Sequence, residues 1–487
     1  MTSSTATADP FPDGAERLSR GAWSMLLVLC SALFLDALDV SMTGVALPSI
    51  RADLGMSTNS LQWVVSAYVI GFGGFLLLGG RAADLLGRRR VFLVSLGVFA
   101  AASGLGGLAD DGSLLIATRF IKGVAAAFTA PAGLSIITTS FAEGPARNKA
   151  LAIYTATGAT GFSLGLVFGG LLTEVGWRWV FLFPMPLALI TLVAATRFVP
   201  NPARPPRSSR AFDVAGAVTL TAAMLLLVYT VVEAPEAGWT SARTPAFLAV
   251  VAALLAAFVA IERRVASPLV RLGLLRSGAL VRANLGAMSL LGGWIGFLFV
   301  ATLYMQQLRG WSALETGLAV FPAGAVVVLV TPRVAPLVAR FGVTRVILAG
   351  LASHALAYAL FVRVGLHSGY AAALLPTFLL VGLGFALAYG PLNIAATAGI
   401  SPEEQGLAGG LVNTSFQFGG ALVLAVVAAV NDAATGPDGS PQALLDGFHA
   451  AAIVSLVAVV LGAGVTARVF RKRSLTCAAP AYHGGCA

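Results

Sequence analysis

The chain consists largely of long apolar stretches that short polar segments interrupt. Most stretches reach about 20 residues, the length that a helix needs to cross the ~30 Å hydrocarbon core of a bilayer. Backbone groups in lipid have no water to bind, so such stretches form helices whose hydrogen bonds are internal. We predict fourteen membrane-spanning helices, in the ranges 23–47, 61–80, 91–109, 113–141, 150–173, 179–197, 214–232, 244–261, 279–304, 314–338, 343–364, 371–399, 405–430 and 448–468.

The composition agrees with this pattern. Hydrophobic residues make up 57% of the chain and charged residues only 11%, and the mean hydropathy is +0.87. A soluble surface cannot be built from so few polar residues. The sequence therefore predicts an all-α membrane protein with contacts to the lipid bilayer.

The basic residues predict the orientation. Placing both termini in the cytoplasm assigns most of the 31 Lys and Arg residues to cytoplasmic segments, including residues 88–90 and 471–473, as the positive-inside rule requires. The net charge of +10 then reflects topology and contact with anionic lipid, not nucleic-acid binding. We predict a multi-pass protein of a bacterial inner membrane.

Two carboxylates, Asp36 and Asp39, lie inside the first apolar stretch. An ionisable group in hydrocarbon is costly unless it is paired or faces water, so these residues indicate a functional site. Arg119 and Lys122 lie in the fourth stretch, also three residues apart. A rise of about 1.5 Å per residue places all four charges at similar depth, which predicts one compensated cluster in which a carboxylate, preferably Asp39, carries a proton.

Two alternatives stay open for these charges. Asp36 would serve equally well as a structural hydrogen-bond partner. Lys122 would avoid the hydrocarbon by extending its side chain toward the outer lipid headgroups.

The segment Gly79–Phe92, GGRAADLLGRRRVF, resembles the signature G-x-L-A-D-R-x-G-R-K of the major facilitator superfamily. Leu85 replaces the first arginine of that signature. The resemblance implies a cytoplasmic latch, in which a tight glycine turn presents a carboxylate to helix ends and arginines. Its matching residues are Gly80, Ala83, Asp84, Gly87, Arg88 and Arg89.

A second, weaker copy of this pattern, APLVARFGVTR, occupies Ala335–Arg345. Aligning Gly342 with Gly87 places Ala339 where Asp84 stands, so this copy lacks the acid. The repeat predicts two related halves, as in other transporters of this kind. Our expected organisation is a disordered cytoplasmic leader (1–20), an N-terminal six-helix bundle (21–199), a cytoplasmic linker (200–211), an inserted two-helix hairpin (212–263), a C-terminal six-helix bundle (264–472) and a disordered cytoplasmic tail (473–487).

The prediction of the inserted hairpin is based on a further resemblance. FDVAGAV at 212–218, Trp239 and SPLVRLGLL at 267–275 are similar to the inserted hairpin of the fourteen-span drug:proton antiporters. LDVSMTGVALP at 38–48 resembles that family's L-D-x-T-V-x-N-V-A-L-P pattern, and TRFIKG at 118–123 resembles R-x-x-Q-G, with Lys122 in place of glutamine. This resemblance implies that Asp39 and Arg119 act in proton coupling and line the substrate cavity.

Glycines recur in the fifth stretch at Gly161, Gly165 and Gly169, with Gly170 following. The spacing of four places the first three on one helix face that another helix can approach closely. The segment resembles the antiporter motif of exporters, although Leu166 stands where that motif has proline. Plain helix packing and a role in coupling both explain the glycines.

The second half offers amides instead of charges. Gln306 closely follows the ninth stretch, Asn393 lies in the twelfth, and Asn413 and Gln417 lie in the thirteenth. Amides in such positions either join helices or line a cavity. We include all four as candidate cavity residues.

No motif indicates an enzyme, a metal site or a nucleotide-driven pump, since the chain lacks a P-loop and a clustered set of catalytic or metal-binding residues. We therefore predict a monomeric proton-coupled antiporter, without cofactors, that exports amphipathic small molecules such as drugs or antibiotics by alternating access. One alternative is a proton-coupled uptake symporter for a nutrient or siderophore. Another is a membrane receptor that does not transport, or a passive pore.

Overall fold

The structure of the protein is a computed structural model. It describes residues 19–141, 145–200, 213–237, 241–265, 273, 277–398, 400, 402–436 and 440–476. The predicted linker after Pro200 therefore lies outside the described residues, as do residues 1–18 of the leader and 477–487 of the tail.

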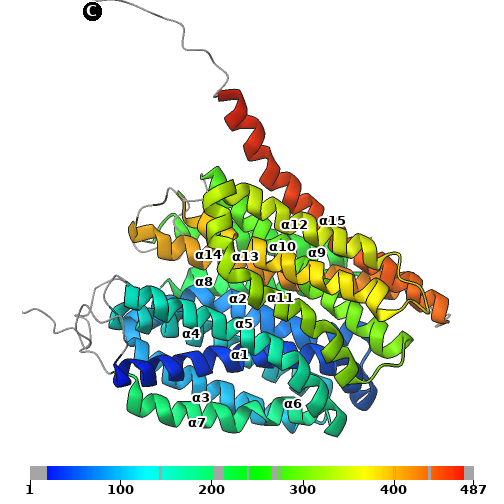
Figure 1. Ribbon diagram of the computed structural model, residues 1–487, viewed down its shortest axis with the longest axis horizontal. Helices are drawn as coiled ribbons and strands as arrows, with labels where there is room; N and C mark the ends of the chain where they lie inside the picture. Colours follow the sequence, from blue (N-terminus) through cyan, green and yellow to red (C-terminus); the bar gives the residue numbers. More distant parts are fainter. Residues whose placement is uncertain are drawn as a thin grey trace, which may run out of the picture.

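The regular secondary structure of the described residues is helical, with no β-strand among them (Figure 1). Two of the helices, η2 and η3, are single π-helical turns. The elements are α1 (Arg20–Leu54), α2 (Thr58–Leu86), α3 (Arg88–Gly107), α4 (Gly112–Ser140), α5 (Pro145–Val175), α6 (Arg178–Leu182), α7 (Pro184–Phe198), α8 (Val214–Ala237), α9 (Arg243–Glu262), α10 (Gly278–Leu303), η2 (Tyr304–Leu308), α11 (Ala313–Phe341), α12 (Val343–Phe361), η3 (Tyr370–Leu374), α13 (Leu375–Thr397), α14 (Pro402–Thr435) and α15 (Pro441–Thr476).

Each predicted apolar stretch coincides with helical residues, and twelve helices of the described residues are long and apolar enough to cross a membrane. Two shorter apolar helical segments, Ser60–Leu76 of α2 and Ala215–Leu227 of α8, fall below that length. The sixth stretch is divided into α6 and α7 at Phe183, beside Pro184, whose nitrogen cannot donate a helical hydrogen bond. Helix α15 extends to Thr476 and so includes residues 473–476, placed by prediction in the tail. Arg, Lys and Leu near this end favour continued helix.

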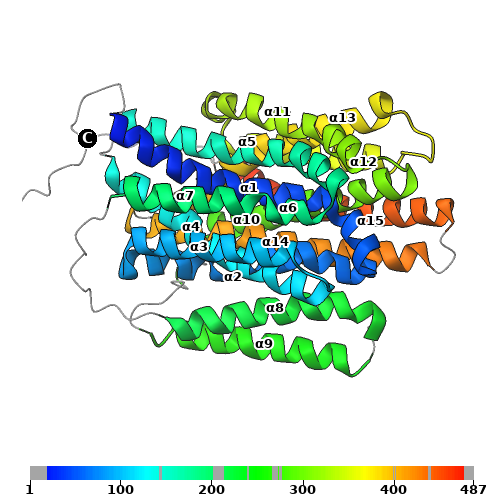
Figure 2. The ribbon, with the colours of Figure 1, turned by 90° about the horizontal axis from the view of Figure 1, so that it is seen from below.

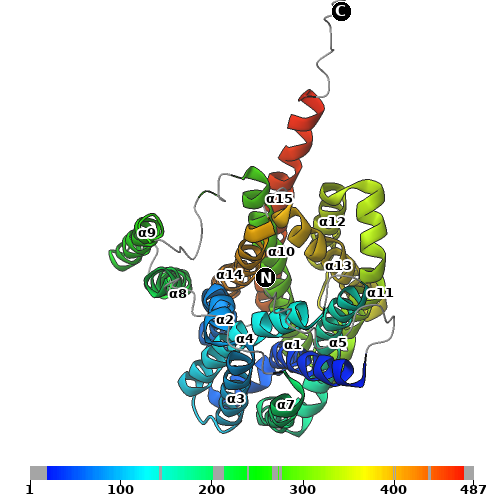
Figure 3. The ribbon, with the colours of Figure 1, turned by 90° about the vertical axis from the view of Figure 1, so that its left-hand side faces the viewer.

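The helices form two bundles with the same internal arrangement (Figure 3). In the first, α1 packs on α5, α2 on α4, and α3 on both α4 and α7. In the second, α10 packs on α14, α11 on α13, and α12 on both α13 and α15. The matched neighbours relate α1–α7 to α10–α15 as two copies of one motif.

The two copies share an unusual turn. Gly87 alone joins α2 to α3, with φ +96°, and Gly342 alone joins α11 to α12, with φ +84°. Glycine enters this region without the steric cost that other residues meet. The shared geometry agrees with the alignment of these two glycines. We call this end of the molecule the Gly87 end, and the opposite end, where Gly55 ends α1, the Gly55 end.

Helices α8 and α9 lie as a pair beside the two bundles (Figures 2 and 3). Helix α8 packs against both α2 and α14. The Thr221 hydroxyl donates a hydrogen bond to the Gly74 carbonyl of α2 at 2.9 Å, and Leu411 of α14 packs against the small cluster of Leu220 and Phe258. The pair therefore covers the seam between the bundles.

The bundles meet through α2 with α14 and through α5 with α11. Near the Gly55 end, Gln306 Nε2 donates to the Val45 carbonyl at 2.9 Å, and the Leu314 N–H donates to Glu174 Oε1 at 3.3 Å. Toward the Gly87 end α11 is exposed on most faces, with Leu329 63% exposed. The described contacts thus hold the bundles together most firmly near the Gly55 end.

Candidate functional site

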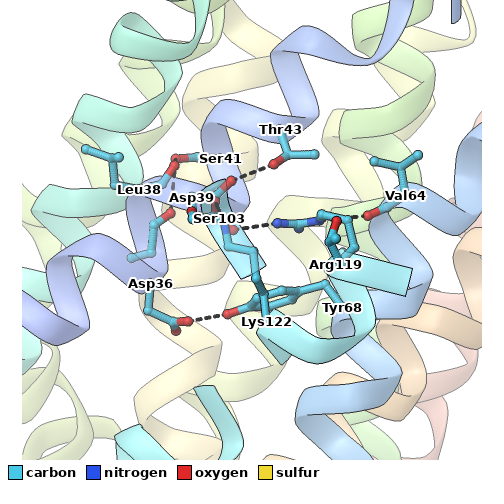
Figure 4. A network of polar contacts seen from close by, with 12 residues as sticks. Asp36, Leu38, Asp39, Ser41, Thr43, Val64, Tyr68, Ser103, Arg119 and Lys122 are labelled. Carbon is cyan, nitrogen blue, oxygen red and sulfur yellow. Dashed lines mark hydrogen bonds and ion pairs between the residues drawn. The ribbon is translucent and has the colours of Figure 1, made fainter. Parts of the chain in front are cut away.

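Asp39 lies at the centre of the most buried charged cluster of the described residues (Figure 4). Its carboxylate accepts from Arg119 Nη1 at 2.5 Å through one oxygen and from Lys122 Nζ through the other. The side chains of all three residues are at most 1% exposed. The two buried cations therefore share one buried anion, which lowers the cost of burying all three charges.

Each cation has further partners. Arg119 Nε donates to the Val64 carbonyl at 2.9 Å, and its guanidinium lies over the Tyr68 ring, 4.6 Å from the centroid. Lys122 Nζ donates to Ser103 Oγ at 2.8 Å. These bonds fix both cations in place, so the cluster is preorganised.

Lys122 does not extend toward lipid headgroups, and the snorkelling alternative is wrong. Its ammonium group lies over the rings of Phe99 and Phe181, at 4.7 and 5.5 Å from their centroids. Aromatic faces attract cations, most strongly where water is excluded. The acceptor on α1 and the rings on α3 and α6 together draw the side chain into the bundle.

Asp36 occupies a separate position. Its carboxylate accepts a hydrogen bond from the Tyr68 hydroxyl (Figure 4), and no ion pair of Asp36 is found among the described residues. Asp36 is partly exposed, whereas Asp39 is fully buried. The expected single cluster of four paired charges is therefore divided, because the Tyr68 side chain contacts Asp36 with its hydroxyl and Arg119 with its ring.

The local sequence explains how α2 and α4 approach closely enough to build this site. A methyl group at Gly123 of α4 would collide with the backbone of Tyr68 on α2. The absence of a side chain at Gly123 lets the two backbones touch. This contact brings Arg119 within reach of the Val64 carbonyl.

The glycine face of α5 packs on α1. A Cβ at Gly161 or Gly165 would approach the carbonyl of Phe34 or Leu38 to 2.6 Å. Gly169 meets α1 one turn further along, at Met42. Gly170 instead faces α11, where a Cβ would lie 2.6 Å from the Leu314 Cα. Close helix packing thus accounts for all four glycines, and any part in coupling stays a prediction.

The four candidate amides do not form one group. Gln306 joins η2 to α1 near the Gly55 end. Asn413 donates to the Gly409 carbonyl at 2.8 Å and approaches Asn393 Oδ1 at 3.4 Å, whereas Gln417 lies against Gly73 of α2. The positions of these amides in the sequence could not show that their side chains have different partners on different helices.

The predicted latch is described only in part. Gly80 lies near Pro131 of α4, Gly87 forms the turn, and Arg89 donates to the Thr196 carbonyl of α7. Arg88 begins α3 and takes part in an interaction of its own. The side chain of Asp84 lies outside the described residues, so its pairing stays a prediction.

Sequence reasoning missed Tyr68, Ser103 and the two rings over Lys122. Tyr68 carried a usable signal, because a tyrosine hydroxyl inside an apolar stretch needs a hydrogen-bond partner. Ser103 and the rings are ordinary residues of apolar helices. Only the packing of α3 on α4, and of α6 on α3 and α1, brings them to Lys122.

The chain is similar in sequence to known proteins. The model of the Major Facilitator Superfamily matches residues 29–424. The cephamycin export protein of Amycolatopsis lactamdurans is 39% identical over 447 residues, covering 90% of this chain and 92% of the relative. The puromycin resistance protein of Streptomyces alboniger is 37% identical over 463 residues, covering 92% and 91%.

Among solved structures, the fold is similar to that of a bacterial homologue of the human lysosomal transporter Spinster. That structure has a TM-score of 0.67 and 15% identity, over 93% of this chain and 98% of that one. Such low identity relates the folds alone. The relatives in sequence are transporters of this superfamily rather than enzymes. This chain therefore belongs to the Major Facilitator Superfamily.

Proposed function

We propose that this protein is a proton-coupled antiporter that exports amphipathic small molecules from a bacterial cell. The observation that carries the proposal is the fully buried ion cluster of Asp39, Arg119 and Lys122, with a second carboxylate, Asp36, nearby. A charged group buried in a membrane bundle is costly to keep, and such groups characterise ion and proton pathways.

The relatives support the direction of transport and the class of substrate. One is a cephamycin export protein and another is a puromycin resistance protein. A lincomycin resistance protein of Streptomyces lincolnensis is 33% identical over 414 residues. Antibiotic-like compounds with both polar and apolar parts are accordingly the proposed substrates.

The proposed topology has fourteen crossings and both termini in the cytoplasm. The α8–α9 pair supplies the two crossings beyond the two bundles. The Gly87 end carries the basic residues 88–90 and is cytoplasmic in this topology, in keeping with the positive-inside rule. The protein works as a monomer in the inner membrane.

The proposed mechanism is alternating access. Contacts near the Gly55 end and exposure of α11 toward the Gly87 end support an inward-facing arrangement. Rocking of the bundles then breaks the bonds of Gln306 and Glu174 and exposes the ion cluster to the outside. The latch around Gly87 closes the cytoplasmic side.

The proton gradient supplies the energy. A potential of 100 mV provides about 2.3 kcal/mol for each proton that enters. For one-for-one exchange with an uncharged substrate, this supports a concentration ratio of roughly 50-fold. No cofactor is required.

The test uses purified protein in liposomes that contain a trapped pH dye, with equal pH on both sides. Potassium and valinomycin hold the membrane potential at zero. Tetraphenylphosphonium, puromycin or lincomycin is added outside, and protein-free liposomes serve as the control. Tetraphenylphosphonium is informative because it has no exchangeable proton, so its passive entry cannot alter the internal pH.

The sign of the pH change separates the candidate functions. An antiporter makes the lumen more alkaline as substrate enters, whereas an uptake symporter makes it more acidic. A passive pore admits substrate without a pH change, and a receptor admits none. Acidification, or entry without any pH change, would refute the antiport proposal.

A further inference from the structure

We propose that Asp36, hydrogen-bonded to Tyr68, carries the exchanged proton, while Asp39 remains the permanent counter-ion of Arg119 and Lys122. This inference rests on the proposed antiport function and assigns the roles within its site. It reverses the sequence-based preference for Asp39. The argument depends on the different partners and exposure of the two carboxylates.

Asp39 is poorly placed to exchange a proton. Both of its oxygens are occupied by buried cations, and the residue is 0% exposed. Protonating it would leave Arg119 and Lys122 buried without their shared anion, and an uncompensated buried charge is strongly unfavourable. These two ion pairs assign Asp39 the role of counter-ion.

Asp36 has the opposite properties. It is partly exposed and has a neutral hydroxyl as its hydrogen-bond donor. Its protonation removes one negative charge without breaking an ion pair. The titratable and charged groups that face it are Tyr68 of α2, Tyr154 of α5, Asp39 of α1, and Arg119 and Lys122 of α4.

Tyr68 acts as a positioning residue between Asp36 and Arg119. Its hydroxyl donates to Asp36, and its ring supports the Arg119 guanidinium at 4.6 Å. When hydronium transfers a proton to Asp36, water leaves and the carboxyl group becomes a donor. The neutral carboxyl group is a weaker acceptor than the carboxylate, so the hydrogen bond from Tyr68 weakens and the ring that packs on Arg119 is held less firmly. Proton loading is thereby linked to the α2–α4 contact.

The charges of the site also define the substrate. Asp36, Asp39, Arg119 and Lys122 sum to zero when Asp36 is ionised, and to +1 when it is protonated. A substrate with a positive charge or strong donor group binds the ionised form better, so it competes with the proton as antiport requires. An anion would favour the protonated form and travel with the proton. The inferred substrate class is amphipathic compounds that present a cation or donor to Asp36.

The experiment measures the pH dependence of tetraphenylphosphonium binding to detergent-solubilised protein. One-proton competition predicts that the dissociation constant of wild type falls up to tenfold per pH unit until Asp36 is ionised, and then levels. Asp36→Asn should bind with a pH-independent constant. Tyr68→Phe should keep the one-proton slope with a changed midpoint, which a purely structural role would not produce.

The liposome assay separates failure of this inference from failure of the proposed function. If wild type alkalinises the lumen and Asp36→Asn does not, the result supports both antiport and the assignment of the proton to Asp36. If wild type alkalinises the lumen and folded Asp36→Asn retains the same response and pH-dependent binding, this assignment is overturned while antiport survives. If wild type gives no alkalinisation with any compound, the proposed function fails. Size-exclusion chromatography establishes that Asp36→Asn is folded.

Discussion

Asp39→Asn should strongly destabilise the protein, because it removes the one anion that Arg119 and Lys122 share. Loss of one partner of a buried ion pair costs about 3–5 kcal/mol, since the remaining charge is left without compensation. Lys122→Met alone should cost less, about 1–3 kcal/mol, because Asp39 keeps Arg119 as its partner. An Asp→Asn change at a carboxylate without ion-pair partners would instead have little effect on stability, because the amide has nearly the same shape.

The double variant Asp39→Asn/Lys122→Met provides the decisive comparison. It removes one anion and one cation, so only Arg119 loses its counter-ion. The double variant should be more stable than Asp39→Asn alone, with a coupling energy of at least about 1 kcal/mol. Thermal unfolding in detergent, followed by tryptophan fluorescence, gives the order of the three variants.

Asp53→Asn is a matched control on the same helix. Asp53 also accepts from an arginine, Arg178, at 2.7 Å, but the two side chains are 47% and 38% exposed. An exposed pair contributes at most about 1 kcal/mol, so this variant should unfold close to wild type. Additive losses in the double variant, or equal losses from Asp39→Asn and Asp53→Asn, would refute the reasoning about burial.

Three further predictions follow from the packing and charge of the site. Gly165→Ala should lower stability by about 1–3 kcal/mol through overpacking, whereas Gly44→Ala, which has open space around it, should be neutral or stabilising in the same unfolding assay. Gln306→Ala removes the hydrogen bond to the Val45 carbonyl, which stabilises the closed Gly55 end by about 1 kcal/mol. The population of molecules open at that end should therefore rise roughly fivefold. Unchanged distances between spin labels on α1 and α11 would contradict this. Lys122→Gln lowers the site charge by one and removes a repulsion between Lys122 and the bound cation of about 1–2 kcal/mol, at an effective dielectric constant of ~20 across ~10 Å. Tetraphenylphosphonium should therefore bind roughly tenfold more tightly by calorimetry. Weaker binding would count against the charge argument.

The sequence by itself determined where helical segments form and which charged residues belong to the candidate site. Hydrophobic length and composition are local properties, so each apolar stretch coincides with helical residues. Charges in apolar stretches are rare because they are costly, and this singled out Asp39, Arg119 and Lys122 before their contacts were known. The glycine turn at Gly342 was likewise predictable from its likeness to Gly87, because glycine is favoured at positive φ.

Only the tertiary structure decided how the charges are divided. Spacing along a helix gives the face and depth of a side chain, but partners also depend on the rotation and approach of neighbouring helices. The contact of α2 with α4 at Gly123 places Tyr68 between Asp36 and Arg119. Helices α3 and α6 place aromatic rings against Lys122. These contacts join residues far apart in the chain, so no local pattern contains them. They assign Asp39 two cations and leave Asp36 with a single neutral donor.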